Sequence, residues 1–281
     1  TAFFDTRKVT SSETHATATA DSGTSSGEYN FEIFQLATSA KQLGASDVGA
    51  AVNTSSAMSS GGFSIAVTGG TVTVQGKQVT VSTDDSLTTT LAAIKTAVGG
   101  SFDYSLSGDK VTLTDSSEIV LGSATDTSNF LQALRLNANG TTSISSSGKL
   151  GGIDISVTPA NANFTDGAGA ASGSFKINGT TISWDSSATI TDILDKINSS
   201  EASVYANYDP VNDRFLLTNK TTGDVGITLE DVTGDFLAKS RLLTANSGAL
   251  SRGKNLLYKV NDAGPLESKS NTIDSNSSGI Q

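Results

Sequence analysis

Residues 174–198 read SFKINGTTISWDSSATITDILDKIN, and residues 71–95 carry a second version of the same pattern, TVTVQGKQVTVSTDDSLTTTLAAIK. In the later stretch apolar residues alternate around Asn178-Gly179, a pair that favours a two-residue hairpin because both turn positions need positive φ. The same alternation surrounds Gln75-Gly76 in the earlier stretch. The alternating positions are Phe175, Ile177, Ile182 and Trp184 in the later copy and Val72, Val74, Val79 and Val81 in the earlier one. Each stretch therefore predicts a β-hairpin.

A helical period follows each predicted hairpin. Apolar residues recur at the i, i+3, i+4, i+7 spacing that places them on one face of a helix. They are Ile190, Ile193, Leu194 and Ile197 in the later copy and Leu87, Leu91 and Ile94 in the earlier one. Thr189 with Asp192 resembles a capping box, and Ser86 takes the equivalent N-cap position. Burial of such a stripe is worth about 1.5–3 kcal/mol per side chain, enough to dock a short helix.

Strands are expected again after each helix. The later copy predicts a hairpin over residues 204–217 and a third strand at 227–229. The earlier copy predicts the same elements over residues 102–113 and 119–121. Because the elements keep their order and the length differences fall in turns, we interpret the chain as carrying a duplicated ββαββ unit. Each copy is expected to be an antiparallel sheet with one helix packed on a face.

The predicted fold class is therefore α+β and β-rich, with two duplicated domains that project from a split domain formed by the two chain ends. An N-terminal hairpin is expected, with strands at residues 17–20 and 28–36 and a turn at 21–27. A further strand is expected near the other end, at residues 256–260. Each end is too poor in apolar residues to form a core alone, so the two ends are expected to pair. The expected domains are a body of residues 1–52 and 248–281, a first head domain of 62–140, and a second head domain of 150–246.

Composition excludes several classes of function. A chain of 281 residues is long enough for two or three compact units. The net charge of -10 and the 18 scattered Lys and Arg residues argue against nucleic acid as a partner. The absence of cysteine excludes disulfides, thiolate metal sites and a cysteine nucleophile. No apolar stretch approaches the roughly 20 residues that span a bilayer, and no signal peptide opens the chain. We therefore expect no membrane partner, and any export signal is expected to be absent or to lie outside the chain.

Several stretches also carry a resemblance to a known family. They are RKVTSS at 7–12, GEYNFEIFQLA at 27–37, INGTTISWD to ITDILDKINSS within 177–200, YDPVNDRFLLTNKTTG at 208–223 and SKSNTID at 268–274. In these stretches the sequence resembles the head and upper body of the bacterial flagellar filament capping proteins, the hook-associated protein type two family. The INGTTI block resembles the flagellar hook IN motif, from which Val74-Gln75 departs. Neither end shows the heptads of the family's coiled-coil legs, so an internal fragment is expected.

The resemblance implies a structural and assembly role. It implies secretion through the flagellar channel, a ring-shaped homo-oligomer at the distal filament tip outside the cell, and help for flagellin insertion and polymerisation. Flagellin and further copies of the chain are the implied partners, together with an export chaperone through an absent C-terminus and host-surface glycans. Two alternatives stay open: another flagellar axial protein, such as a hook-filament junction protein or flagellin variant, and a non-flagellar surface adhesin module. Terminal sequence with a helical leg would separate the cap from the other axial proteins.

No residue set in the sequence predicts catalysis, a cofactor or a metal site, so we expect no enzyme. His15 has no Cys or acidic neighbour and lies in a predicted Thr/Ala strand. Asp209, Asn212 and Asp213 suggest a calcium loop, but the Gly and the distal Glu of an EF-hand are missing, and a hairpin turn is the interpretation. Trp184 could stack on a sugar, although its match to Val81 favours a core role. The N-x-S/T triplets are expected by chance and receive no function; they open at Asn53, Asn139, Asn163, Asn178, Asn198, Asn219 and Asn276.

Overall fold

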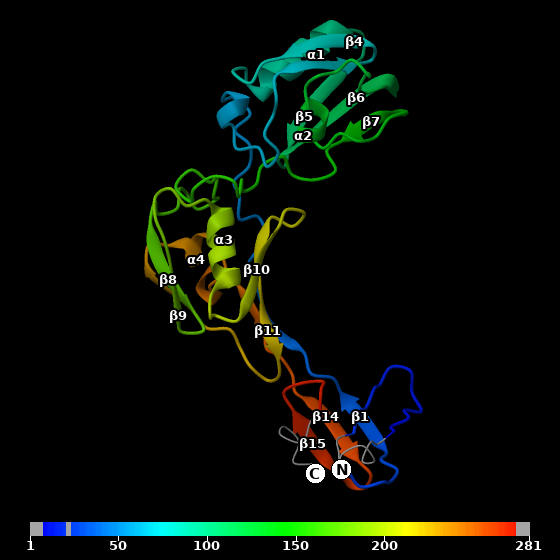
Figure 1. The fold of residues 1–281 in the computed structure, drawn as a ribbon. Helices are drawn as coiled ribbons and strands as arrows, with labels where there is room; N and C mark the ends of the chain where they lie inside the picture. Colours follow the sequence, from blue (N-terminus) through cyan, green and yellow to red (C-terminus); the bar gives the residue numbers. More distant parts are fainter. Residues whose placement is uncertain (1–7, 21–23, 274–281) are drawn as a thin grey trace. The chain divides into compact units, whose positions relative to one another are not determined.

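The computed structural model describes residues 8–20 and 24–273 (Figure 1). The chain divides into two compact units. The terminal unit comprises Thr1–Ala40, Thr221–Val225 and Arg252–Gln281, and the large unit comprises Lys41–Lys220 and Gly226–Ser251. Small antiparallel sheets dominate the described residues, with short helices between them. The predicted α+β, β-rich fold class is confirmed.

The terminal unit is built around a three-stranded sheet. Its order is β1-β14-β15, with bounds Phe31–Gln35, Leu256–Val260 and Ala263–Ser268. Strand β1 pairs antiparallel with β14, so that Ile33 lies opposite Tyr258. The two chain ends therefore share one sheet, as their low apolar content predicts. Leu256, Tyr258 and Val260 form its small core with Ala37.

The N-terminal hairpin predicted from the sequence is wrong in its first strand. Residues 17–20 form no strand, and part of the predicted turn, residues 21–23, lies outside the described residues. Residues 17–19 are exposed, and β1 takes its antiparallel partner from β14 instead. An alternating Thr/Ala pattern cannot form a strand without a partner to complete its hydrogen bonds.

Tyr258 offers a test of packing in the terminal unit. Its side chain is buried, and its hydroxyl has no hydrogen-bond partner among the described residues. Because an unsatisfied buried hydroxyl costs free energy, Tyr258→Phe should stabilise this sheet by about 1 kcal/mol. Hydrogen-exchange mass spectrometry should then find slower exchange in the peptide that contains β14. Tyr29→Phe, which changes an exposed ring, should leave that exchange unaltered; faster exchange in Tyr258→Phe would contradict the prediction.

The first head unit lies within residues 52–151 of the large unit. Its elements are the 3₁₀ helix η2 (Met58–Ser60), β3 (Gly70–Val74), β4 (Lys77–Val81), α1 (Leu87–Val98), β5 (Asp103–Ser107), β6 (Lys110–Ile119), α2 (Phe130–Ala133) and β7 (Thr141–Ser145). Strands β3 and β4 form a hairpin, and β5, β6 and β7 form a sheet in that order. Helix α1 contacts both β4 and β5. One hydrophobic cluster joins these elements, and it includes Leu91, Phe102 and Phe130.

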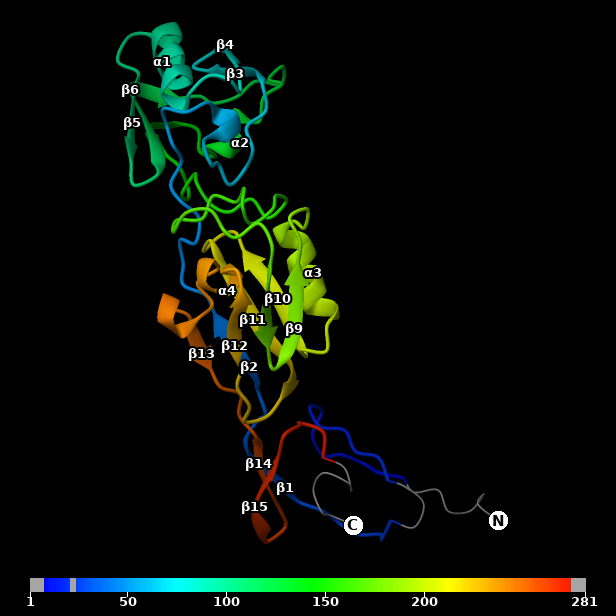
Figure 2. The same cartoon turned by 90° about the vertical axis from the view of Figure 1, so that its left-hand side faces the viewer.

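The second head unit repeats this plan. Its elements are β8 (Gly173–Ile177), β9 (Thr180–Trp184), α3 (Ile190–Ser199), β10 (Val204–Asp209), β11 (Arg214–Thr222), β12 (Leu229–Thr233), α4 (Phe236–Lys239), the 3₁₀ helix η3 (Thr244–Asn246) and β13 (Ala249–Ser251). Helix α3 packs against β10 and β9 (Figure 2). The predicted capping box is present, because Thr189 accepts from the Asp192 N–H while the Asp192 carboxylate accepts from the Thr189 N–H.

The two head units share one order of elements and one spacing. Gly70 begins β3 and Gly173 begins β8, which is 103 residues later, and Leu87 and Ile190 begin the two long helices at the same spacing. The short helices begin at Phe130 and Phe236. The sheet-plus-helix unit predicted from the sequence is thus present in two copies. The copies differ in the third strand of the hairpin sheet, because β12 pairs with β8 whereas Leu121 makes a single bridge to Val74.

Strand β2 (Ser39–Leu43) reveals how the two head units are connected. It lies in the second head's sheet, whose order is β10-β11-β2-β13, although it precedes the first head in the chain. The first head is therefore inserted between β2 and the rest of the second head. We propose in consequence that the body ends near residue 40, not at residue 52, and that the second head begins with β2.

Candidate functional site

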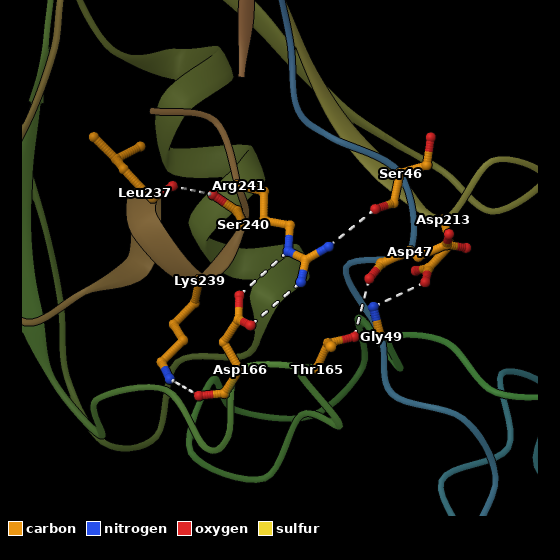
Figure 3. Close-up of polar contacts among 10 residues, drawn as sticks. All are labelled: Ser46, Asp47, Gly49, Thr165, Asp166, Asp213, Leu237, Lys239, Ser240 and Arg241. Carbon is orange, nitrogen blue, oxygen red and sulfur yellow. Dashed lines mark hydrogen bonds and ion pairs between the residues drawn. The ribbon is translucent and has the colours of Figure 1, made fainter. Parts of the chain in front are cut away.

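The most elaborate polar arrangement in the large unit lies where the two connecting segments meet the head hairpins. We call residues 44–52 connector A and residues 146–166 connector B. The amide groups of connector A bond to the β10–β11 hairpin, where the Asp213 carboxylate accepts from the Gly49 N–H at 2.8 Å and the Asp213 carbonyl accepts from the Val48 N–H at 3.1 Å. Figure 3 shows Asp213 reaching Gly49. The hairpin turn therefore holds the chain that leads to the first head.

Asp213 also satisfies a buried hydroxyl. The Tyr208 side chain donates to the second oxygen of the Asp213 carboxylate at 2.6 Å. Burial raises the pKa of Tyr208, and the bond to Asp213 raises it further. Asp213 itself is buried and has a positive φ of 46°, a conformation that Asp adopts more readily than most residues. The tyrosine hydroxyl and the aspartate carboxylate thus form one buried contact.

The first head uses the equivalent aspartate for the same purpose. Asp109, at φ 61°, accepts from the N–H of Val52 at 2.9 Å and from that of Gly151 at 2.8 Å. Its carbonyl accepts from the Leu150 N–H at 2.9 Å. Each head hairpin therefore binds connector backbone through an aspartate at its turn. The sequence indicates Asp213 and Asp109 only as residues of predicted turns, at 209–213 and 107–109. Their shared place after each hairpin's first strand is the signal that could have identified the pair.

Glycine is required where the connectors cross. A Cβ at Gly49 would overlap the backbone of Gly152, and a Cβ at Gly151 would overlap the Ala50 carbonyl. Asn163 fixes the same crossing through two hydrogen bonds. Its side-chain amide donates to the Ala50 carbonyl at 3.0 Å, and its main-chain carbonyl accepts from the Ala50 N–H at 2.8 Å. The crossing is therefore built from backbone contact that admits no side chain.

A salt bridge closes the second head against both connectors. The Arg241 guanidinium donates through two nitrogens to the Asp166 carboxylate, each at 3.2 Å, and through the third to the Ser46 carbonyl at 3.2 Å (Figure 3). Lys239 donates to the Asp166 carbonyl. Hydrogen bonding to Arg241 lowers the pKa of Asp166 below its ordinary value of 3.8. Arg241 has φ 53°, and Arg135 in the first head has φ 54° at the equivalent place.

The salt bridge predicts a pH-dependent contribution to stability. The lowered pKa of Asp166 means that its charged form stabilises the fold at pH values above the unfolded pKa, near 3.8, and that this contribution disappears as the pH falls through the folded pKa. Because the Asp166 side chain is half exposed, Asp166→Asn should cost up to about 1 kcal/mol at pH 7. Urea denaturation should show this loss at pH 7 and a smaller loss at pH 3.

Asp84→Asn is the matched control for that experiment. Asp84 is exposed, and its carboxylate has no hydrogen bond or ion pair within the part of the chain that the structure describes. This variant should match the parent chain at both pH values. An Asp166→Asn loss of equal size at pH 7 and pH 3 would show that the charge of Asp166 is not what stabilises the connector.

The Asn of the IN motif has a defined structural role. Asn178 takes φ 50° in the β8–β9 turn, and its side-chain oxygen accepts from the Thr228 N–H at 3.0 Å. Gln75 takes the same φ in the β3–β4 turn, and its side-chain oxygen accepts from the Val120 N–H at 3.0 Å. Gln75 in the earlier copy therefore makes the same type of bond as Asn178, to the segment that follows the second hairpin. Asn and Gln can both accept this bond because each side chain has a carbonyl oxygen.

The other candidate residues are not brought together. His15 is exposed and contacts the Thr14 hydroxyl at 3.3 Å, outside any strand. Trp184 is buried beside Phe175 and Phe236, so the core role is confirmed. Asp209 accepts from the N–H groups of Val211 and Asn212 and forms the expected hairpin turn. Three positions named in the sequence analysis, Arg7, Asp274 and Asn276, lie outside the described residues.

The described residues contain no group of three or more His, Cys, Asp or Glu side chains placed to hold a metal ion. None of their helices combines the length and the apolar character that a membrane crossing needs.

Comparisons with known proteins complete the description of the chain. No family model matches it. It is 28% identical over 248 residues to flagellar hook-associated protein 2 of Thermotoga maritima, an alignment that covers 82% of this chain and 40% of that protein. The crystal structure of the flagellar cap protein FliD from Helicobacter pylori covers 89% of this chain and 95% of that chain at 12% identity, with a TM-score of 0.20 that supports no structural argument. The chain thus spans about two fifths of its curated relative, and its predicted resemblance to flagellar hook-associated protein 2 is confirmed.

Proposed function

We propose, from the similarity to flagellar hook-associated protein 2, that this chain is the head-bearing part of a flagellar filament cap. In this proposal it acts outside the cell at the distal end of the filament, as a homo-oligomer that promotes flagellin insertion. The observation that carries the proposal is the alignment over 248 residues, because it covers 82% of this chain. The role is structural, and no step of it requires a reaction.

The architecture suits such a role. The two head units have small cores and surfaces rich in Ser and Thr, and their connectors are fixed by the turn aspartates Asp109 and Asp213 and by a backbone crossing. Connectors held in this way join each head to the chain through fixed hydrogen bonds and not through a flexible linker. Such a joint lets a head resist displacement as flagellin passes. An export chaperone and host-surface glycans stay predictions that rest on the family resemblance alone.

Immunogold electron microscopy tests the proposal. Antibodies raised against this chain should label the distal tips of flagellar filaments on the bacterium that encodes it. An antibody against flagellin, which should label the whole shaft, is the positive control, and antibody absorbed with the pure chain is the negative control.

Each alternative predicts a different pattern of gold. Label along the shaft would indicate a flagellin variant, label at the filament base would indicate a hook-filament junction protein, and label on the cell body would indicate an adhesin module. Any of these three patterns without label at the tip would overturn the filament cap proposal.

A further inference from the structure

Strands β7 and β2 occupy the same place in the two head units. The residue after β7, Ser146, donates its N–H to the Val111 carbonyl at 2.8 Å, and the residue after β2, Gly44, donates to the Phe215 carbonyl at 2.8 Å. The next residues, Ser147 and Ala45, donate to the carbonyls of Arg135 and Arg241. Leu150 and Val48 then bond to the two turn aspartates. The three donors of the first head each lie 102 residues after their counterparts in the second, so β7 is to the first head what β2 is to the second.

The two strands differ in what lies on their outer side. In the second head β13 pairs antiparallel with the outer edge of β2, from Ala249 opposite Leu43 to Ser251 opposite Lys41. In the first head β7 is the last strand of the sheet among the described residues. The first head therefore has an open position at the place where the second head holds a strand.

The backbone of β7 is oriented to receive a strand. Ser146 bonds inward to Val111, and alternate residues of an antiparallel strand direct their N–H and C=O groups to opposite sides. Ser143 and Ser145 therefore direct theirs outward, as Lys41 and Leu43 do in β2. The outward Ser143 carbonyl accepts only from the nearby Thr141 hydroxyl, at 3.0 Å.

Neither β7 nor β13 is protected in the usual way. Exposed edges are commonly guarded by a charge or a proline in the strand, and both TTSIS of β7 and ALS of β13 contain neither. Strand β13 is itself the last strand of its sheet, and Leu250 is 41% exposed. Strands β7 and β13 are therefore both uncharged edges, one on each head.

We propose that β7 of one copy of this chain pairs with the outer edge of β13 of a second copy. The two edges are unlike, so each copy can use its β7 with one neighbour and its β13 with another, and such head-to-tail contacts generate rings when the rotation closes. The inference deepens the filament cap proposal and rests on it for the ring. The precedent for the contact is internal, since β13 already fills the equivalent position on β2.

Disulfide trapping tests the contact directly, because the chain has no cysteine of its own. In β13 the N–H and C=O groups of Leu250 face outward, because its neighbours Ala249 and Ser251 pair with β2. Ser143 and Leu250 are both exposed and can lie directly opposite each other in an antiparallel pair. A mixture of Ser143→Cys and Leu250→Cys chains should form a mixed disulfide dimer on mild oxidation, since paired strands bring Cβ atoms within bonding range. Arg252→Cys in place of Leu250→Cys covers the neighbouring register.

Thr114→Cys provides the matched control. Thr114 is exposed on the central strand β6, opposite Ser143, so it shares the face but not the edge. Its mixture with Leu250→Cys should give several-fold less mixed dimer. Equal yields in the test and control mixtures, or no dimer with Ser143→Cys in either register, would overturn the proposal. A predominance of Ser143→Cys homodimers would also overturn it, in favour of symmetric pairing of two β7 strands.

A second experiment blocks the edge. Ser143→Pro removes an outward N–H without removing a bond to β6, and Ser143→Lys adds an edge charge if the proline variant does not fold. Sedimentation velocity should show concentration-dependent association in the parent chain and in Thr114→Lys, and less in both Ser143 variants. Tip labelling without mixed disulfides would reject the contact between β7 and β13 and leave the cap proposal standing. Mixed disulfides without tip labelling would support that contact and reject the cap proposal.

Discussion

Replacing Phe236 by alanine should lower the free energy of unfolding of the second head by about 3–5 kcal/mol. Phe236 is buried, and its ring stacks on that of Phe175, with centroids 5.5 Å apart and planes 17° apart. The rings of Trp184 and Phe215 lie 5.9 and 6.0 Å from it. A large cavity would open at the centre of this cluster, and the three aromatic residues that remain lie on different strands and cannot close it without moving the sheet.

Trp184 makes the measurement specific. It is the single tryptophan of the chain and contacts Phe236, so its fluorescence during guanidinium denaturation reports on the second head alone. Phe236→Leu, which keeps most of the volume, should cost less than about 1.5 kcal/mol. Phe130→Ala makes the equivalent change in the first head and should leave the Trp184 transition in place. An unchanged midpoint in Phe236→Ala would show that the cluster does not hold the head together.

Replacing Asp213 by alanine should cost the second head about 2–4 kcal/mol, because two donors lose their acceptor. The Tyr208 hydroxyl and the Gly49 N–H both bond to its carboxylate, at 2.6 and 2.8 Å, and the carboxylate is buried. Alanine also tolerates the positive φ of this position less well than aspartate. Trp184 fluorescence measures the loss of stability, and hydrogen exchange at connector A should rise.

Two variants separate the possible causes of that loss. Asp213→Asn keeps one acceptor oxygen and tolerates the positive φ, so it should lie between the parent chain and Asp213→Ala. Asp109→Ala removes the equivalent carboxylate of the first head and should raise exchange at residues 52 and 151 without shifting the Trp184 transition. Equal stability of Asp213→Ala and the parent chain would mean that solvent replaces the carboxylate at the hairpin turn.

Local elements of this protein could be read from its sequence. The Asn-Gly and Gln-Gly turns, the alternating strands and the apolar stripes predict β3, β4, α1 and their later counterparts, because each depends on residues a few positions apart. The capping box at Thr189 follows for the same reason. The pairing of the chain ends was predicted from their low apolar content, and β1 and β14 do pair.

Part of the candidate site was also visible without coordinates. The sequence indicates Asp213 and Asn212 as turn residues, yet the Gly49 N–H that bonds to the Asp213 carboxylate lies in connector A, 164 residues away. A turn pattern indicates where a carboxylate sits and says nothing of the distant backbone that it binds. The role of Asp109 was missed for the same reason.

What the sequence by itself determined is the repeated unit, its hairpins, its helices and the family that it resembles, since periodicity and turn chemistry are local properties of the chain. Only the tertiary structure decided that β2 joins the second head, that the first head is inserted behind it, and that β7 is left with an open edge. Strand partners far apart in the chain are selected by backbone hydrogen bonds, and every strand offers the same N–H and C=O groups. Because those groups carry no residue-specific signal, the choice between β2 and β13 as the neighbour of β11 emerges only when the whole sheet has assembled.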